Sequence, residues 1–419
     1  MLAPQIVSPA GNLQKLKLAT SYGADAVYAG LSVFSLRSRA AREFNAKTFA
    51  QGVEYAHSKG VKVYATVNGF HNSAALPGLE RHFKELADFG VDAFIVASIG
   101  AMAMARRVAP EVALHVSTQA NILNYADAKV YEDMGASRVV VARELGMQDI
   151  RAIKEQCPKL SIEAFVHGSM CFAYSGRCLI SALQSNRKSN RGACANDCRF
   201  PYELYAKGEN GTVFRLEQNE GGTHVFNSKD LNLASHIKDI MAQGLIDAFK
   251  IEGRTKSEYY VALATRTYKM AVKDAMEGVF DAKKYEKELS TLQNRGFTDA
   301  FLNAAPNERE DTQNHESSVL AGSASVEAFS ENGFEFASKG LIKAKELYEV
   351  LLPLGQKPSE FEDECCEFFY QNEQPLLRFK KLVSSSGKGF LELHSGNTNL
   401  CTIKTPLPPL CFLRSFKEA

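Results

Sequence analysis

The chain has 419 residues, a formal net charge of +1 and a hydrophobic content of 45%. A chain of this length is too long for one ordinary core, so we expect two domains or one large barrel with an appendage. The near-neutral balance excludes a polycation, so any nucleic-acid site must be a local patch. No apolar run approaches the length of a membrane span and the first residues lack signal-peptide features, so we expect a cytoplasmic protein without a membrane anchor.

The first 254 residues repeat a strand-then-helix rhythm. The candidate strands are Gln5–Ser8, Ala26–Gly30, Lys62–Val67, Ala93–Ala97, Ala113–Ser117, Arg138–Val141, Ile162–Val166 and Ala248–Ile251. Amphipathic segments lie between most of them, and Gly23, Gly60, Gly90 and Gly135 close four of these, as glycine does at helix ends. Eight alternating units predict a parallel (β/α)8 barrel. An open doubly wound sheet is the alternative, but no G-x-G-x-x-G follows the first strand.

The eighth strand comes late, because about eighty residues separate Val166 from Ala248 where one unit needs about thirty. We therefore expect an insertion, residues 170–245, after strand seven at the C-terminal mouth of the barrel, where barrel enzymes place their chemistry. Within it we expect a hairpin or loop over Lys207–His224, a short strand His224–Phe226 and a helix Leu233–Ala242. A long helix, Lys256–Glu277, closes the barrel region.

The sequence pattern changes after the barrel region. We expect the barrel with its insertion to occupy residues 1–277, a polar connector to occupy 278–317, and a small β-rich, barrel-like domain to occupy 318–419. Short strands separated by Ser, Gly and Asn indicate this last domain: Val319–Val326, Phe334–Ala337, Leu377–Leu382, Phe390–His394 and Leu400–Ile403.

The insertion holds four cysteines with the spacing C-x6-C-x15-C-x3-C: Cys171, Cys178, Cys194 and Cys198. In a cytoplasmic chain with nine cysteines, metal ligands or free thiols are expected instead of disulfides. Four thiolates in one short segment suit a [4Fe–4S] cluster. They also suit a structural zinc ion, although the x6 gap is wide for zinc. Unligated buried cysteines are the third interpretation.

Strand alternation predicts which side chains face the barrel interior, because residues two apart share a face. The predicted inward faces are His115, Ser117, Gln119 and Asn121, then Glu163, Phe165 and His167, then Lys250, Glu252 and Arg254. Polar groups inside a barrel must be paired or functional. The members nearest the strand ends are the better functional candidates, with Arg143 after strand six. For His115 and Lys250, a structural network and a functional role have equal weight.

Charged residues at the predicted mouth have two interpretations each. Arg143-Glu144 is either an exposed ion pair or part of the site, and Arg254 and Lys256 lie at the rim, where Arg favours two-pronged carboxylate binding. His167 is either structural or a group that orients substrate or bonds near the cysteines. A basic set forms a solvated face or a phosphate-binding rim for RNA. It comprises Arg177, Arg187, Lys188, Arg191 and Arg199 in the insertion, with Arg37, Arg39 and Arg42 after strand two.

Several motifs resemble those of one family. The run Glu163-x-Phe165-x-x-Gly168-Ser169-Met170-Cys171, followed by Gly176-x-Cys178-x-x-Ser181, resembles the signature of the U-thirty-two, or collagenase-like, peptidase family. The pair Cys194-x-x-x-Cys198 resembles the branch of prephenate-dependent tRNA uridine hydroxylases. Other segments of the sequence also resemble this family: SLRSRAAREF, HVSTQAN, AREL, NSKDL and KIEGRTKS.

The resemblance implies a (β/α)8 barrel, a [4Fe–4S] cluster and oxygen-independent 5-hydroxylation of the wobble uridine in tRNA, with prephenate as the hydroxyl source. Other branches hydroxylate ribosomal RNA or a quinone precursor. Some relatives take a cluster ligand just after NSKDL; here that position is Asn232, which leaves Cys198 as the fourth ligand.

These expectations assign roles to individual residues. The assigned catalytic residues are His167, Arg143 and Glu144; those for a small dicarboxylate are Gln119, Arg254, Lys256 and Arg37; those for RNA are Arg177, Arg187, Lys188 and Arg191.

Two other functions compete with RNA hydroxylation. A peptidase is possible with a Cys171–His167 nucleophile, but H-E-x-x-H and G-x-S-x-G are absent from the sequence. A non-catalytic RNA-binding or scaffold protein is the other, and the polar inner faces weigh against it. The oligomeric state is not readable from the sequence.

Overall fold

The computed structural model describes residues 3–31, 34–35, 44–171, 173–174, 177–187, 189, 193–207, 211, 213–216, 227–300, 302, 312, 314, 322–396 and 400–416. Eight parallel strands form its first part, and each pairs with the next along the chain. They are β1 (Gln5–Ala10), β2 (Ala26–Ala29), β3 (Lys62–Val67), β4 (Ala93–Val96), β5 (Ala113–Val116), β6 (Arg138–Val140), β7 (Ser161–Ser169) and β11 (Ala248–Ile251). Since β11 pairs with both β7 and β1, the sheet closes on itself, and the predicted (β/α)8 barrel is confirmed.

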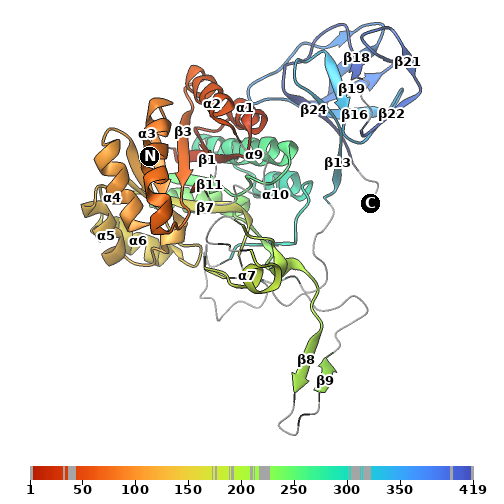
Figure 1. Cartoon of the computed structure of the whole chain (residues 1–419). Helices are drawn as coiled ribbons and strands as arrows, with labels where there is room; N and C mark the ends of the chain where they lie inside the picture. Colours follow the sequence, from red (N-terminus) through yellow and green to blue (C-terminus); the bar gives the residue numbers. More distant parts are fainter. Residues whose placement is uncertain are drawn as a thin grey trace.

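Helices alternate with these strands and surround the barrel (Figure 1). They are α1 (Leu13–Ser21), α2 (Ala46–Ser58), α3 (Leu76–Asp88), α4 (Ile99–Val108), α5 (Tyr125–Asp133), α6 (Met147–Gln156), α8 (Ile237–Gln243) and α9 (Glu258–Glu277). Side chains cap several N-termini; the Asn12 carboxamide, for example, accepts a hydrogen bond from the Lys15 amide at 2.8 Å. Within the described part of the chain, no helix is both long and apolar enough to cross a membrane.

The faces of the barrel strands explain why the chain closes in this way. Outward residues such as Val27, Val63 and Phe94 are buried against the helices. Inward residues such as Tyr28 and Tyr64 form a separate apolar cluster inside the barrel. Strands buried on both faces are expected in a parallel barrel. The interior between these strands is therefore filled with side chains.

The insertion between β7 and β11 is anchored to the barrel at both ends. β7 extends beyond the barrel and pairs in antiparallel fashion with β10 (Asp230–Asn232), while β12 (Phe297–Thr298) adds to the outer edge of β10. Between them lie α7 (Ile180–Ser185) and a hairpin of β8 (Leu204–Lys207) and β9 (Val213–Leu216). Figure 1 shows α7 close to the barrel and the hairpin projecting away from it. The predicted strand His224–Phe226 lies outside the described residues.

After α9, helix α10 (Ala282–Ser290) leads to an antiparallel β-rich region, as predicted. Eight strands make its main sheet, in the order β17-β18-β19-β16-β24-β13-β14-β23. They are β13 (Ala324–Ser330), β14 (Glu335–Ser338), β16 (Leu347–Leu351), β17 (Phe361–Glu362), β18 (Cys366–Gln371), β19 (Gln374–Phe379), β23 (Leu400–Thr402) and β24 (Cys411–Phe416). Two small ribbons accompany it: β15 (Leu341–Lys343) with β22 (Glu392–His394), and β20 (Leu382–Val383) with β21 (Gly389–Phe390). The domain boundaries set from the sequence stay predictions.

The β-rich region is joined to the barrel by buried polar contacts. The Arg414 guanidinium donates to Glu288 at 2.9 Å, to Glu349 at 2.6 Å and to the Tyr259 hydroxyl at 2.9 Å. On the other side of the junction, the Tyr22 hydroxyl of α1 donates to the carbonyl oxygen of Leu351 at 2.9 Å. Arg414 is only 3% exposed, so these bonds lie inside the molecule.

Candidate active site at the barrel mouth

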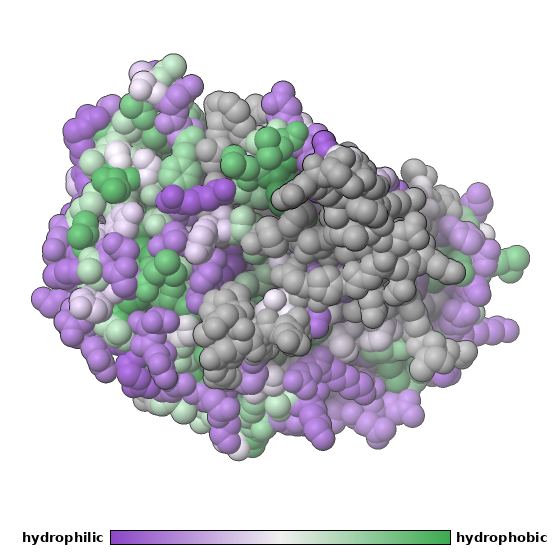
Figure 2. Space-filling model, turned by 90° about the horizontal axis from the view of Figure 1, so that it is seen from below, coloured by the Kyte–Doolittle hydropathy of each residue, from purple (hydrophilic) through white to green (hydrophobic). Residues whose placement is uncertain are grey.

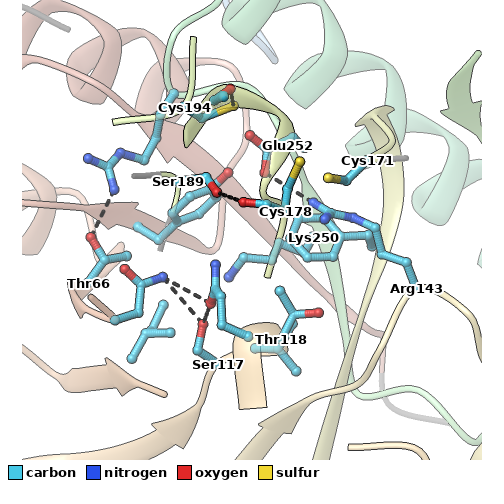
Figure 3. A pocket seen from close by; sticks show the side chains of 18 of the residues that line it. Thr66, Ser117, Thr118, Arg143, Cys171, Cys178, Ser189, Cys194, Lys250 and Glu252 are labelled. Atoms are coloured by element: carbon cyan, nitrogen blue, oxygen red, sulfur yellow. Dashed lines mark hydrogen bonds and ion pairs between the residues drawn. The ribbon is translucent and has the colours of Figure 1, made fainter. Parts of the chain in front are cut away.

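A cavity of about 140 Å³ opens at the C-terminal ends of the barrel strands, beneath the insertion. Its lining includes all four cysteines of the insertion: Cys171, Cys178, Cys194 and Cys198. Figure 3 shows Cys171, Cys178 and Cys194 on one side of this cavity, facing Ser117 and Thr118 on the other. The fold therefore brings residues spread over C-x6-C-x15-C-x3-C to one wall of one cavity.

The four thiols are free, since none forms a disulfide. Burial raises the pKa of Cys198, and the other three cysteines act in the same direction while Arg199 opposes them. Hydrogen bonds hold the surrounding loop: the Ser189 hydroxyl donates to the Cys178 carbonyl at 2.5 Å, and the Ala195 amide donates to the Ser181 hydroxyl at 3.2 Å.

The spacing of the thiols bears on which metal group they fit. Among the described residues, no group of three His, Cys, Asp or Glu side chains lies close enough together to hold a single metal ion. Thiolates around one zinc ion at about 2.3 Å are nearly in contact with each other. A four-iron cluster takes one thiolate per iron and spans more space, so it needs ligands further apart. Whether the four thiols hold a cluster or a zinc ion stays a prediction.

A polar wall formed by barrel side chains faces the cysteines. The Arg254 guanidinium is buried and donates to the Ser35 hydroxyl at 2.7 Å and to the Thr66 hydroxyl at 3.0 Å. The Asn68 carboxamide donates to Gln119 at 3.2 Å. Two of the four predicted substrate-binding residues, Gln119 and Arg254, line the cavity, and hydrogen bonds fix their orientation.

Arg143 and Glu252 form a charged pair on the same cavity. The Arg143 guanidinium lies 4.1 Å from the centre of the Phe165 ring, and its Nη2 is 3.4 Å from Glu252 Oε2. Both side chains are about 10% exposed. Glu252 is the only carboxylate among the described residues that line the cavity. Sequence reasoning placed Glu252 on the inward face of its strand but did not assign it a role; the two-residue alternation with Lys250 and Arg254 was the available signal.

Below the cavity, buried charges form a paired network. Lys250 Nζ lies 2.5 Å from Glu163 Oε1, and Arg138 donates to Glu163 at 3.1 Å. The pKa of Glu163 is lowered because Lys250 and Arg138 outweigh the opposing effect of burial. Burial and the nearby Arg138 lower the pKa of His115 to about 3, so this imidazole is neutral. The His115 ring lies edge-on to Tyr64 at a centroid distance of 4.6 Å, while Lys250 is paired with Glu163 and also reaches the cavity.

His167 does not face the barrel interior, and that prediction is wrong. The register between β7 and β11 shifts there, because Phe165 lies opposite Lys250 but His167 lies opposite Ile251. This bulge breaks the alternation and turns the imidazole outwards. It packs against the rings of Tyr260, Tyr268 and Phe297, at centroid distances of 5.6, 5.5 and 6.0 Å. Burial lowers its pKa to about 4.

The remaining predicted site residues lie outside the first cavity or outside the described residues. Glu144 is half-buried and does not line the cavity. Lys256 lines an adjoining cavity. Arg177 is exposed and Arg187 is half-buried in the insertion. Arg37, Lys188 and Arg191 lie outside the described residues.

The outer surface at this end of the molecule mixes polar and apolar residues. Figure 2 shows hydrophilic and hydrophobic patches interspersed there. Tyr174, Leu179 and Leu183 of the insertion are 52%, 69% and 80% exposed. An exposed aromatic ring of this kind is a surface on which an unpaired RNA base can stack.

Comparisons with known proteins identify the relatives of the chain. The family model of peptidase family U32 matches residues 11–312. A protein of Helicobacter pylori named tRNA hydroxylation protein P is 48% identical over 98% of both chains. The 23S rRNA 5-hydroxycytidine C2501 synthase of Escherichia coli is 34% identical over 72% of this chain and 45% of its own length. A collagenase of Porphyromonas gingivalis is also 34% identical, over 71% of this chain and 73% of its own length.

Proposed function

The chain belongs to peptidase family U32, and we propose that it is an RNA-modifying enzyme that hydroxylates tRNA. The finer proposal is oxygen-independent hydroxylation at C5 of the wobble uridine, with prephenate as the hydroxyl source. The observation that carries the proposal is the 48% identity, over 98% of both chains, to a protein named tRNA hydroxylation protein P. A match over the full length includes the insertion and the C-terminal β-rich region as well as the barrel.

The polar wall of the cavity supports the binding of two polar reactants. Gln119 and Asn68 offer amide groups of the kind that pair with the edge of a base. Arg143 and Arg254 offer guanidinium groups that suit carboxylates. A uridine has to leave its stack to reach such a cavity, as bases that undergo enzymatic chemistry do.

We assign the cysteines Cys171, Cys178, Cys194 and Cys198 as the ligands of a [4Fe–4S] cluster, with zinc as the alternative. When bound, such a cluster supplies one-electron chemistry or holds the insertion in place. The four free thiols around one cavity support this assignment.

Glu252 is the residue that we assign to proton transfer. Replacement of the hydrogen at C5 of uridine by a hydroxyl group that the donor gives up as hydroxide releases one proton and two electrons. A base must accept the proton, and a bound cluster would pass the electrons one at a time to an external electron acceptor. Glu252 is the only carboxylate in the described lining of the cavity, and Arg143 holds its orientation. A carboxylate within reach of the reacting atom is an ordinary general base.

The test is nucleoside mass spectrometry of tRNA from cells that lack the protein, with and without a plasmid that restores it. Loss of 5-hydroxyuridine derivatives, restored by the wild type but not by Cys178→Ala, supports the function and the need for this thiol. Unchanged tRNA refutes the tRNA assignment, and ribosomal RNA is then measured by the same method. A Cys178→Ala protein that is active but free of iron removes the cluster from the mechanism.

Peptidase activity is the second candidate, because a relative of 34% identity is named collagenase. The nucleophile pair Cys171–His167 that this activity would use is not assembled at the cavity, since Cys171 lines it and His167 packs outwards against α9. Cleavage of collagen by the iron-loaded protein, lost in Cys171→Ala while iron is retained, would restore this candidate.

A further inference from the structure

A second cavity, of about 240 Å³, adjoins the first on the outer side of Glu252. We call it the lysine chamber; it is lined by Ser169, Arg199, Thr255 and Lys256, and it shares Cys194 and Glu252 with the first cavity. Its residues come from the end of β7, from the insertion and from the loop between β11 and α9. Two cations and one carboxylate therefore face its interior, and the carboxylate already contacts Arg143.

Lys256 is the distinctive group of this chamber. Its side chain is half-buried and its ammonium lies 5.2 Å from the centre of the Tyr260 ring. In the described parts of the chain, no carboxylate is within ion-pair distance of Lys256; the nearby Asp230 is engaged by Arg295. Burial lowers the pKa of Lys256, and the charges of Arg295 and Arg199 act in the same direction against those of Asp230 and Glu252. The chamber thus holds the two cations Lys256 and Arg199 against Glu252 alone, which Arg143 already pairs, so an anionic ligand would balance its charge.

We propose that the lysine chamber binds a carboxylate group of a small organic acid between Lys256 and Arg199, while the first cavity receives the base. This inference rests on the proposed function, because it assigns its two reactants to two compartments. The compartments meet at Cys194 and Glu252, so the reacting ends of both ligands come together beside the cysteines and the proton acceptor.

The occupant is a small acid and not an RNA phosphate for a geometric reason. A phosphodiester is bonded to ribose on both sides, so it requires an open groove along which the strand continues. The chamber is instead bounded by the β7 end at Ser169, the insertion at Arg199 and the β11–α9 loop. A terminal carboxylate enters such a space from one side and bonds to charged donors at its end.

The experiment measures binding of prephenate to the iron-loaded protein by calorimetry, with inorganic phosphate as a second probe. Lys256→Met keeps the aliphatic stem over Tyr260 and removes the charge, and we expect it to raise the Kd for prephenate at least about tenfold. Lys256→Arg is expected to restore most of the affinity. Lys238→Met is the matched control, because it removes the same charge from an exposed position on α8 and should leave the Kd unchanged.

Parallel measurements separate this proposal from its competitors. Iron content, visible spectrum and affinity for an anticodon stem-loop RNA should be unchanged in Lys256→Met. If Lys256→Met binds prephenate as the wild type does but binds RNA more weakly, the proposal is overturned in favour of an RNA phosphate. Tighter binding of inorganic phosphate than of prephenate to the wild type overturns it in the same way. Unchanged binding with a shifted cluster potential assigns Lys256 to balancing the charge of the cysteine site.

The same measurements distinguish the chamber from the proposed function. Prephenate binding that depends on Lys256, in a protein whose loss leaves tRNA unchanged, keeps the chamber and refutes the tRNA substrate. If the wild type does not bind prephenate, the proposal for the lysine chamber is overturned. The tRNA function is then tested by nucleoside mass spectrometry alone.

Discussion

Glu252 and Glu144 differ in position although both follow barrel strands closely in sequence. Glu252 lines both cavities and contacts Arg143, whereas Glu144 lines neither. The sequence motif Arg143-Glu144 drew attention to a carboxylate that lines neither cavity, because adjacent residues at a strand end point in different directions. Which carboxylate reaches the site therefore depends on which face of the strand points into the barrel. In the sequence, only the alternation within β11 indicated that face.

Replacing Glu252 tests its assignment. We expect Glu252→Gln to lower the rate of tRNA hydroxylation by at least about 100-fold, because general-base catalysis contributes factors of this size. Iron content should be unchanged. The measurement is the rate of 5-hydroxyuridine formation in purified tRNA by mass spectrometry.

Glu144→Gln provides the comparison at the neighbouring strand end. It should keep the rate within about twofold of the wild type, since the side chain does not reach the cavity. A Glu252→Gln protein with the wild-type rate would show that another group accepts the proton.

At the scale of elements, much of the barrel could be predicted from periodicity. Polar and apolar residues alternate in β5 and β11, and Gln119, Glu252 and Arg254 lie at the cavity as expected. β7 followed the same rule as far as Phe165 and departed from it at His167, where the register shifts. A bulge is a property of two paired strands, so it has no signature in the sequence of one of them.

The meeting of the four thiols and the lysine chamber were not predictable in the same way. The spacing of the cysteines places them in one segment, but their convergence depends on how the insertion folds back over the mouth. Cys194 and Lys256 line one chamber although they come from separate elements. Such contacts depend on long-range packing, which single-sequence patterns do not contain.

The outward position of His167 leads to a prediction about pH. Its pKa is about 4 in the folded protein against an ordinary value of 6.5, so between these values the unfolded chain binds a proton that the folded chain does not. Its stabilising contribution is complete above pH 6.5 and falls as the pH decreases to 4, by up to about 1.4 kcal/mol per pH unit. We expect His167→Gln to show a shallower loss of thermal midpoint between pH 7 and pH 5, measured by calorimetry.

An exposed histidine serves as the reference for this experiment. The side chain of His394 is 63% exposed, so His394→Gln should keep the wild-type dependence on pH. If His167→Gln retains the wild-type slope as well, then His115 or the carboxylates account for the acid sensitivity, and the buried imidazole does not.

For the whole molecule, Arg414 is the main polar connection between the barrel part and the C-terminal β-rich region. It bridges Glu288 of α10 and Glu349 of β16. Removal of one partner from a buried ionic group leaves the charges of the other partners buried and uncompensated. We expect Arg414→Met to lower the free energy of unfolding by about 3–5 kcal/mol, measured by urea denaturation with circular dichroism.

A surface ion pair across the same junction is the control. Lys17 of α1 lies 3.4 Å from Glu331, whose side chain is 61% exposed. Lys17→Met should change the free energy of unfolding by less than about 1 kcal/mol, as exposed ion pairs contribute little. Equal effects of the two substitutions would mean that the buried cluster is not what couples the two regions.

The anchoring of the insertion also bears on the divergence of the family. Ser169 at the end of β7 pairs with Asp230 of β10 within the insertion, so the segment between them is a loop whose two ends are neighbours. Changing the length of such a loop costs little, because loop-closure entropy grows only slowly with the number of residues. The length and sequence of the insertion can therefore change during evolution while the barrel fold is retained. This chain shares its family with proteins named for tRNA, for ribosomal RNA and for collagen-degrading activity.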